Sequence, residues 1–293
     1  MNRYVSTSNI LMLFLLIYLL SGCSSDSSTK PIDTVEATIQ CSGVTIPENM
    51  DCITLESRDI TVYAPDLPIK GIAILLHGAP GSPKKVNTIF NSKLLGDTQN
   101  LLVATPQGIN RFWGWDSVND TENKLGDVNF LSSVIDQLKI EYNITSDIVY
   151  FLGYSAGGFM TYKLACTIPE KITGIVALAG QFRGEFEKCS TATPVAIHHI
   201  HSYIDSEVPI IGRELGRIRS VDETIAHWQL KNGCSNTFET IQQAKVTAVS
   251  NGTTTQVWQD CSKPVTFSEI DNVPHTSNYD SVALLEIYGW IFN

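Results

Sequence analysis

Ser155 lies in a short segment whose sequence pattern is typical of a nucleophilic serine. Residues 153–157 read Gly-Tyr-Ser-Ala-Gly, which fits the pattern G-x-S-x-G. The apolar run 149–152 before them is typical of a strand buried on both faces, and an apolar pattern of helical spacing follows. A turn this tight has no room for a β-carbon two residues before or after the serine. The pattern predicts a strand, a sharp turn and a helix with Ser155 at the tip as a nucleophile, and the alternative is a glycine-rich turn with an inert serine.

A nucleophilic serine needs a base and an acid that orients the base, and two side chains stand in suitable places. Asp205 comes just after a predicted strand, and His275 lies near the C-terminus, after turn-forming residues and before a last helical pattern. We predict that His275 takes the proton of Ser155, and that Asp205 orients the imidazole and fixes its tautomer. Glu207 is the alternative acid. His77 is the alternative base, although a histidine in a His-Gly step more often supports its loop.

Two backbone amides could stabilise the negative charge that develops when a serine attacks a carbonyl group. The predicted strand 72–76 leads into the sequence His-Gly-Ala-Pro-Gly. Pro80 has no N–H group, so the amide of Ala79 is the candidate donor in this loop. Its expected partner is the amide of Ala156, at the start of the helix after the serine, where negative charge is favoured. The alternative is an ordinary glycine-proline turn.

Aromatic residues in the loops could shape a substrate pocket. Trp113 and Trp115 lie in a loop between a predicted strand and a predicted helix, and they could line an acyl or aromatic pocket or simply cover the end of the sheet. We also place His77 and Tyr154 in the expected pocket, because they adjoin the two loops that carry the predicted donors.

Three histidines at positions 198, 199 and 201 could suggest a metal site. In a strand, the side chains of residues 199 and 201 share one face and that of residue 198 lies on the other. No acidic partner stands at ligand spacing, and the cysteines show no C-x-x-C pattern. We therefore interpret the histidines as strand filling and expect neither a metal nor another cofactor.

The predicted elements that must position these side chains alternate between strand and helix. The alternation predicts an α/β protein with a mostly parallel central sheet flanked by helices. A capping box, Ser-Val-Asp-Glu at residues 220–223, begins one of the later helices, which we expect to end before Gly233. Expected strands are 60–63, 72–76, 101–105, 149–152, 174–180, 194–200, 255–258 and 265–270; expected helices are 127–142, 159–165, 220–232 and 281–292.

The composition excludes some classes of partner. The chain has 293 residues and a formal net charge of −10, without a basic cluster, so nucleic acid is not an expected partner.

Seven cysteines are many for a cytosolic enzyme. One could carry a lipid and the other six could form three disulfides. Sequence proximity suggests the pairs Cys41–Cys52, Cys166–Cys189 and Cys234–Cys261. We predict only the last, because a helix end and a strand end could meet there, and the pairing of the other four stays open, since six cysteines allow fifteen connectivities.

The first residues are typical of an export signal. Arg3 precedes the apolar run 10–20, which is short for a membrane span and suitable for a signal-peptide core. The following Leu-Ser-Gly-Cys resembles the lipobox of bacterial lipoproteins, which implies that Cys23 is acylated and anchors the protein to a membrane. Alternatives are an ordinary cleaved signal or an uncleaved anchor. We expect a signal peptide (1–22), a flexible tether (23–37) and one catalytic domain (38–293), outside the cytoplasm, and at the outer membrane if the host is Gram-negative.

Several motifs together resemble a known family. They are LLHG (75–78), PQG (106–108), DVNFLSSVIDQL (127–138), GYSAGGFMTYKLAC (153–166), HSYIDSEVP (201–209), the NGC and DC pair (232–234 and 260–261) and a late histidine. The chain resembles the polyhydroxybutyrate-depolymerase-like esterases, close to the feruloyl and acetylxylan esterases of carbohydrate esterase family 1. This resemblance covers residue 58 to the C-terminus. It implies an α/β-hydrolase that cleaves carboxylic esters with Ser155, Asp205 and His275.

Two departures from that family leave the substrate open. The residues around His275 lack the glycine-rich turn and the tryptophan that the family often has, and the Ala-Pro-Gly after the His-Gly step resembles proline iminopeptidases. A small ester, a polyester or an esterified polysaccharide would all fit as substrate. The alternatives are a prolyl-type serine peptidase and a non-catalytic surface lipoprotein on a hydrolase scaffold.

Overall fold

The structure is a computed structural model that describes residues 39–114, 126–190, 192–276 and 278–292. The predicted signal peptide, the tether, Cys23 and Trp115 lie outside the described residues. The helices are α1 (Pro83–Phe90), α2 (Ser92–Gln99), α3 (Gly126–Glu141), α4 (Ala156–Thr167), α5 (Val221–Asn232) and α6 (Ser281–Tyr288), with short 3₁₀ turns at Ile109–Arg111, Pro169–Lys171, Phe186–Lys188 and Gly289–Phe292.

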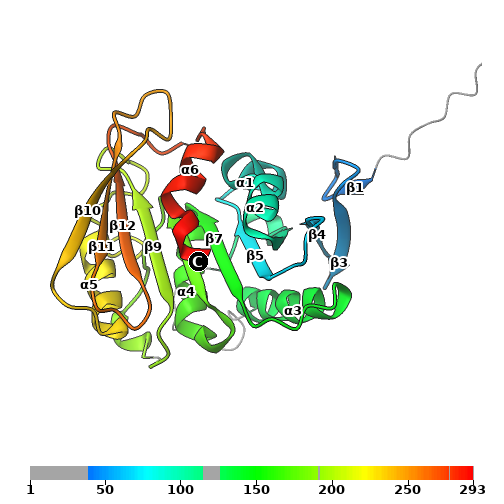
Figure 1. Cartoon of the computed structure of the whole chain (residues 1–293), viewed down its shortest axis with the longest axis horizontal. Helices are drawn as coiled ribbons and strands as arrows, with labels where there is room; N and C mark the ends of the chain where they lie inside the picture. Colours follow the sequence, from blue (N-terminus) through cyan, green and yellow to red (C-terminus); the bar gives the residue numbers. More distant parts are fainter. Residues whose placement is uncertain (1–38, 115–125, 191, 277, 293) are drawn as a thin grey trace, which may run out of the picture. The chain divides into compact units, whose positions relative to one another are not determined.

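A 10-stranded sheet forms the centre of the domain (Figure 1). Its spatial order is β10-β11-β12-β9-β8-β7-β5-β6-β4-β3. The strands from β12 to β6 run parallel, and antiparallel strands extend the sheet at both edges. The strands are β3 (Asp51–Leu55), β4 (Arg58–Tyr63), β5 (Gly71–Leu76), β6 (Leu101–Pro106), β7 (Val149–Tyr154), β8 (Gly174–Leu178), β9 (Ala196–His201), β10 (Phe238–Gln243), β11 (Thr253–Trp258) and β12 (Val265–Ile270), and a separate hairpin joins β1 (Gln40–Cys41) to β2 (Val44–Thr45).

Helices cover both faces of the sheet, which explains why the central strands are apolar throughout. In Figure 1, α1, α2 and α6 lie on one side and α3, α4 and α5 on the other. Side chains alternate between the two cores along each strand: Ile74 packs into the core beneath α3 and α4, whereas its neighbour Leu75 packs into the core beneath α1 and α6. The predicted α/β architecture with a mostly parallel sheet is confirmed.

The order of the strands reverses beside β5. The chain passes from β5 through α1 and α2 to β6 on one side, and then through α3 to β7 on the other side of β5. In open parallel sheets, ligands bind beyond the carboxyl ends of the strands at such a switch point. The loop after β5, at His77, and the turn after β7, at Ser155, flank this position. The topology therefore predicts a ligand site beside these two segments.

The residues before α5 show how local sequence determines one helix start. The Ser220 side chain accepts the Glu223 amide while the Glu223 carboxylate accepts the Ser220 amide, which is the predicted capping box. Gly233 ends the helix in a left-handed conformation with φ 64°. Just beyond it, Cys234 forms a disulfide with Cys261.

Three disulfides join residues that are close in the chain. They are Cys41–Cys52, Cys166–Cys189 and Cys234–Cys261, the pairs that sequence proximity suggests. The first fastens the β1–β2 hairpin to β3, the second ties the end of α4 to the turn before β9, and the third joins the end of α5 to the loop after β11. Within the described residues, no helix combines the length and the apolar character needed to cross a bilayer.

Candidate active site

Ser155 occupies a strained turn between β7 and α4. Its backbone angles, φ 54° and ψ −116°, are rare for a residue with a side chain. A β-carbon on Gly153 would collide with the Gly157 carbonyl, and one on Gly157 would collide with the Leu76 carbonyl of β5. Only glycine therefore fits two residues before and two after the serine. This backbone holds the Ser155 hydroxyl above the carboxyl edge of the sheet, as the sequence predicts.

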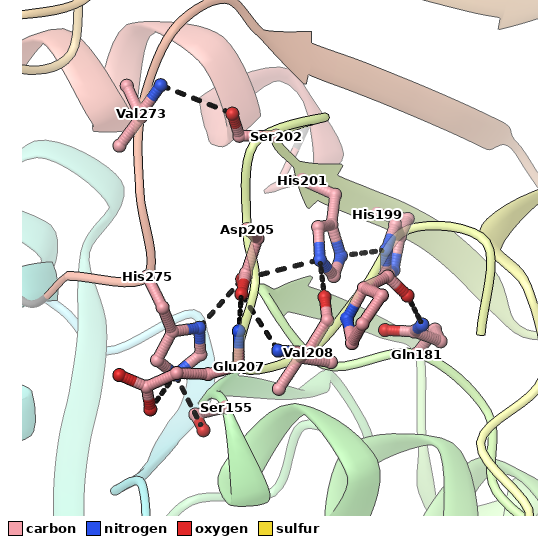
Figure 2. A network of polar contacts seen from close by, with 11 residues as sticks. Ser155, Gln181, His199, His201, Ser202, Asp205, Glu207, Val208, Val273 and His275 are labelled. Atoms are coloured by element: carbon pink, nitrogen blue, oxygen red, sulfur yellow. Dashed lines mark hydrogen bonds and ion pairs between the residues drawn. The ribbon is translucent and has the colours of Figure 1, made fainter. Parts of the chain in front are cut away.

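The structure brings the three predicted catalytic side chains together (Figure 2). The Nε2 atom of His275 lies 3.1 Å from the Ser155 hydroxyl oxygen, and its Nδ1 atom lies 2.7 Å from Oδ2 of Asp205. The three residues follow β7, β9 and β12, which run parallel, so their carboxyl ends meet at one edge of the sheet. A hydroxyl, an imidazole and a carboxylate in this line can move a proton away from the serine oxygen.

Asp205 is buried and fully engaged in hydrogen bonds. Its Oδ1 atom accepts the amides of Glu207 and Val208 at 3.0 and 2.8 Å. Burial by itself would raise the pKa of Asp205, but hydrogen bonds from His201, His275 and the Val208 amide outweigh it and hold that pKa well below its ordinary value. The carboxylate is therefore charged at neutral pH, which is the state that orients an imidazole.

The loop that carries His275 is fastened to the end of β9. The Val273 amide donates to the Ser202 hydroxyl at 3.2 Å (Figure 2), and Asn272 takes a left-handed conformation that turns the chain. The ring of Tyr154, just before the serine, stacks on the His275 ring with centroids 5.3 Å apart. These contacts hold the imidazole between the nucleophile and the acid.

The two predicted oxyanion donors lie close to each other. Ala79 packs against a small apolar cluster that consists of Ala156, Phe159, Val208 and Ile218. Among the described residues, neither the Ala79 amide nor the Ala156 amide donates a hydrogen bond to another protein group. Gly78 brings the loop close to the serine, because a β-carbon there would lie 3.3 Å from Cβ of Ser155. Both amides are thus near the serine and available to an oxygen atom of a ligand.

A hollow of about 290 Å³ opens beside the serine. Polar and charged groups supply much of its wall, including Lys85 and Glu207. Its lining residues are Gly78, Ala79, Pro80, Lys85, Tyr154, Ser155, Glu207, His275 and Thr276. Tyr154 therefore lies in the pocket, as predicted from its place in the chain.

His77 and Trp113 are not where we expected them. His77 is fully buried behind the loop, where its Nδ1 donates to the Gly78 carbonyl at 2.7 Å and its Nε2 accepts the Gly108 amide at 3.0 Å. Trp113 is buried too, and its indole N–H donates to the His77 carbonyl at 2.9 Å. The prediction that these two side chains line the pocket is wrong, because the loop needs them as interior supports. Burial lowers the pKa of His77 to about 4, so the ring is uncharged at neutral pH and supports the loop through its hydrogen bonds.

Glu207, the alternative acid, faces a different atom of the base. Its carboxylate lies 4.0 Å from Nε2 of His275, on the side of the serine, whereas Asp205 contacts Nδ1. The Glu207 side chain is 71% exposed and the Asp205 side chain 2%. Glu207 thus lines the hollow, whereas Asp205 contacts the Nδ1 side of the ring from the interior.

The sequence interpretation missed one interior contact of the acid. Nε2 of His201 lies 3.5 Å from Oδ2 of Asp205 and 2.8 Å from the Val208 carbonyl oxygen. The sequence pattern by itself indicates only strand filling for His201. Its place on the same strand face as His199, four residues before the acid, was the available signal.

Comparison with known proteins now adds to this geometry. The sequence profile of the Phospholipase/Carboxylesterase family matches residues 58–219, which is more than half of the chain. The chain belongs to the Phospholipase/Carboxylesterase family. The matched region of this family member contains β4 to β9, the turn at Ser155 and the loop at Asp205, and it ends before His275.

Curated relatives are named as esterases and depolymerases. The bifunctional acetylxylan esterase/xylanase XynS20E of Neocallimastix patriciarum is 33% identical over 50% of this chain and 21% of its own length. The putative esterase NocK of Nocardia uniformis subsp. tsuyamanensis is 25% identical over 69% and 62%. Poly(3-hydroxyalkanoate) depolymerase C of Paucimonas lemoignei is 29% identical over 42% and 30%. The chain covers less than two thirds of the length of each of these relatives.

Solved structures share the fold at low sequence identity. An acetyl xylan esterase from Aspergillus awamori aligns with a TM-score of 0.61 and 15% identity, over 83% of this chain and 99% of its own. The LpqC poly(3-hydroxybutyrate) depolymerase from Bordetella parapertussis aligns with a TM-score of 0.51 and 12% identity, over 79% and 84%. Together with the family membership, these likenesses show that the chain has the α/β-hydrolase fold.

Proposed function

We propose that the protein is a serine esterase that acts through an acyl-enzyme. The observation that carries this proposal is the continuous line from the Ser155 hydroxyl through the His275 ring to Asp205. Ser155 attacks the ester carbonyl carbon while Nε2 of His275 takes the hydroxyl proton. Asp205 keeps the other ring nitrogen protonated and stabilises the imidazolium.

The remaining steps use the same residues. The amides of Ala79 and Ala156 donate to the oxygen that becomes negatively charged, a contribution of about 3–4 kcal/mol for one such donor in a comparable enzyme. His275 then gives its proton to the departing alcohol oxygen, which leaves the acyl group on Ser155. Water, deprotonated by His275, hydrolyses this acyl ester and restores the serine.

The hollow supports a short acyl group as substrate. Its volume of about 290 Å³ is at the lower end of small-molecule pockets. The polar groups along its wall would not stabilise a long alkyl chain, because burying them against apolar atoms costs free energy. We propose esters of short acids, such as acetyl or short hydroxyalkanoyl groups, borne by an alcohol or by a polymer that extends into solvent. The names of two relatives, an acetylxylan esterase and a polyhydroxyalkanoate depolymerase, agree with this class.

We also propose that the enzyme works outside the cytoplasm, anchored by a lipid on Cys23. The three disulfides support an oxidising compartment, because reducing systems keep cytosolic thiols free. The test is the membrane fraction of cells that express the full chain, with and without the substitution Cys23→Ser. If the lipid anchors the protein, the substitution releases the esterase from the membrane. The same amount of esterase in the membrane fraction with and without the substitution would exclude the lipid anchor.

The test of the activity is hydrolysis of p-nitrophenyl acetate by the purified enzyme and by Ser155→Ala. We expect the substitution to lower kcat by about 10⁴-fold or more, since the nucleophile is lost, with an unchanged melting temperature. Retained turnover would mean that another residue is the nucleophile. Methyl ferulate, acetylated xylan and hydroxybutyrate oligomers as further substrates separate the ester classes. Cleavage of proline-nitroanilide without cleavage of esters would instead indicate a prolyl-type peptidase.

A further inference from the structure

A chain of buried hydrogen bonds ends at the acid of the proposed active site. The Tyr162 hydroxyl lies 3.0 Å from Nδ1 of His199, and Nε2 of His199 lies 3.1 Å from Nδ1 of His201. Nε2 of His201 then faces the Val208 carbonyl at 2.8 Å and the Asp205 carboxylate at 3.5 Å. Figure 2 shows the two imidazoles behind Asp205, on the side away from His275. The proposed reaction uses none of the three interior side chains directly.

The direction of the donors follows from the buried end of the chain. Burial raises the pKa of Tyr162, so its hydroxyl keeps the proton and donates to Nδ1 of His199. Burial, with smaller contributions from His201 and His198, lowers the pKa of His199 well below its ordinary value, so the ring is neutral. A neutral ring that accepts at Nδ1 carries its proton on Nε2 and donates to Nδ1 of His201. His201 in turn accepts at Nδ1 and carries a proton on Nε2.

This last proton points at the turn that holds the acid. The Val208 carbonyl accepts it at short distance, and the Val208 amide donates to Oδ1 of Asp205. His201 therefore fixes Val208, and Val208 fixes the carboxylate. The next carbonyl, that of Pro209, is held by the Gln181 side chain at 2.8 Å, so the interior anchors the turn at two consecutive residues (Figure 2).

We propose that His201, with its tautomer determined by His199 and Tyr162, is a positioning residue for Asp205. It places a hydrogen-bond donor behind the carboxylate and clamps the 205–208 turn, so that Oδ2 stays in line with Nδ1 of His275. This inference rests on the proposed function, because it assigns Asp205 as the acid of the active site. A carboxylate so held cannot rotate away from the imidazole when the ring becomes charged, and that fixed geometry is what catalysis requires.

The kinetic test compares three variants. His201→Leu removes the donor, and we expect kcat on p-nitrophenyl acetate to fall about 10- to 100-fold with KM changed by less than about twofold. His201→Gln keeps an N–H donor near the Nε2 position. Its decrease in log kcat should therefore be at most about half of the decrease in His201→Leu. His198→Leu is the matched control, since His198 is equally buried on the same strand but bonds to Ser268 on the opposite face.

The outcomes separate a positioning role from lost stability. The inference predicts that His198→Leu lowers the melting temperature as much as His201→Leu but leaves kcat within about twofold of the unsubstituted enzyme. Equal loss of kcat in both variants, or no loss in His201→Leu, would overturn it. If the unsubstituted protein hydrolyses no ester, or if Ser155→Ala retains full ester hydrolysis, the proposed function itself is wrong. The inference about His201 is then decided by the measurement that follows, which does not use activity.

A second readout does not depend on activity. Nitrogen-15 spectra of histidine-labelled protein report which ring nitrogen carries the proton. The chain predicts the Nε2–H tautomer for both His199 and His201 in the folded protein, and Tyr162→Phe should disturb the His199 signals most, because Nδ1 loses its donor. An Nδ1–H tautomer at either histidine would overturn the chain even in an active enzyme.

Discussion

Two neighbouring carboxylates differ in burial and in the atom of the His275 ring that they face. Asp205 is enclosed, accepts two backbone amides and contacts Nδ1 of His275. Glu207 is exposed and lies 4.0 Å from Nε2, at the wall of the hollow. Sequence reasoning left both open, since each follows β9 at a plausible distance. The turn that buries one and exposes the other is visible only in three dimensions.

The substitutions Asp205→Asn and Glu207→Gln test this assignment. Asparagine keeps the size but can hold the imidazole in the wrong tautomer, so we expect Asp205→Asn to lower kcat by about 10³- to 10⁴-fold. Glu207→Gln should change kcat by less than about fivefold, because an exposed charge at 4.0 Å is screened by water. Steady-state hydrolysis of p-nitrophenyl acetate measures both. A larger loss in Glu207→Gln than in Asp205→Asn would exchange the two roles.

At the scale of elements, the turn between β7 and α4 depends on close backbone contacts with the ends of two neighbouring strands, β5 and β8. Gly157 lies against the Leu76 carbonyl of β5, and Gly158 approaches Gly180 just after β8. The Ser155 amide donates to the Leu178 carbonyl at 2.8 Å, which also ties the turn to β8. The strained backbone at Ser155 is therefore held by its neighbours, as strain at a functional site must be.

The substitution Gly157→Ala should destabilise the protein and impair the site together. Its β-carbon would meet the backbone of β5, which cannot give way like a flexible side chain, so we expect a loss of about 1–3 kcal/mol in the free energy of unfolding. Esterase activity should fall at least about tenfold, because the serine is displaced. Urea unfolding and p-nitrophenyl acetate hydrolysis measure the two effects.

Gly126→Ala is the control, since a β-carbon at the first residue of α3 meets no atom of the described residues within 4 Å. It should leave both quantities unchanged or raise stability slightly. Gly157→Ala with full activity and stability would mean that the turn is looser than the structure indicates.

The elements that sequence reasoning found are those whose pattern is set by burial on both faces. The apolar runs of β5, β6, β7 and β8 and the stripe of α3 are clear in the sequence, and their order places the site. The strand β10 was missed, because it is an edge strand with mostly exposed side chains and no alternating apolar face. The helices α1 and α2 were missed as well, since each has only eight residues and they adjoin at Asn91.

At the scale of the whole molecule, the protein buries several histidines in neutral form. Burial lowers the pKa of His77 to about 4 and that of His198 to about 3, and it lowers that of His199 as well. The sequence pattern indicates interior packing for the strand histidines and a place in the pocket for His77. The spacing of residues in the sequence cannot distinguish a buried histidine that supports a loop from one that lines a pocket. The interior position decides their protonation and links stability to pH.

Acidification should therefore destabilise the fold before the carboxylates titrate. A histidine whose folded pKa is depressed binds a proton only in the unfolded chain when the pH lies between its two pKa values. Stability is then complete above the unfolded value, about 6.5, and falls with pH toward the folded value, by about 1.4 kcal/mol per pH unit for each such proton. Urea unfolding between about pH 7.5 and 5 should show this decrease. His198→Gln should reduce the slope, and a flat profile would contradict the buried neutral state.

The central claim is that Ser155 is the nucleophile of an ester hydrolase. The most direct measurement is peptide mapping by mass spectrometry after reaction with a fluorophosphonate, which phosphonylates activated serines. We expect one adduct, on the peptide that contains Ser155, formed in step with the loss of esterase activity and absent in His275→Ala. An adduct on another residue, or ester hydrolysis that survives complete labelling of Ser155, would contradict it.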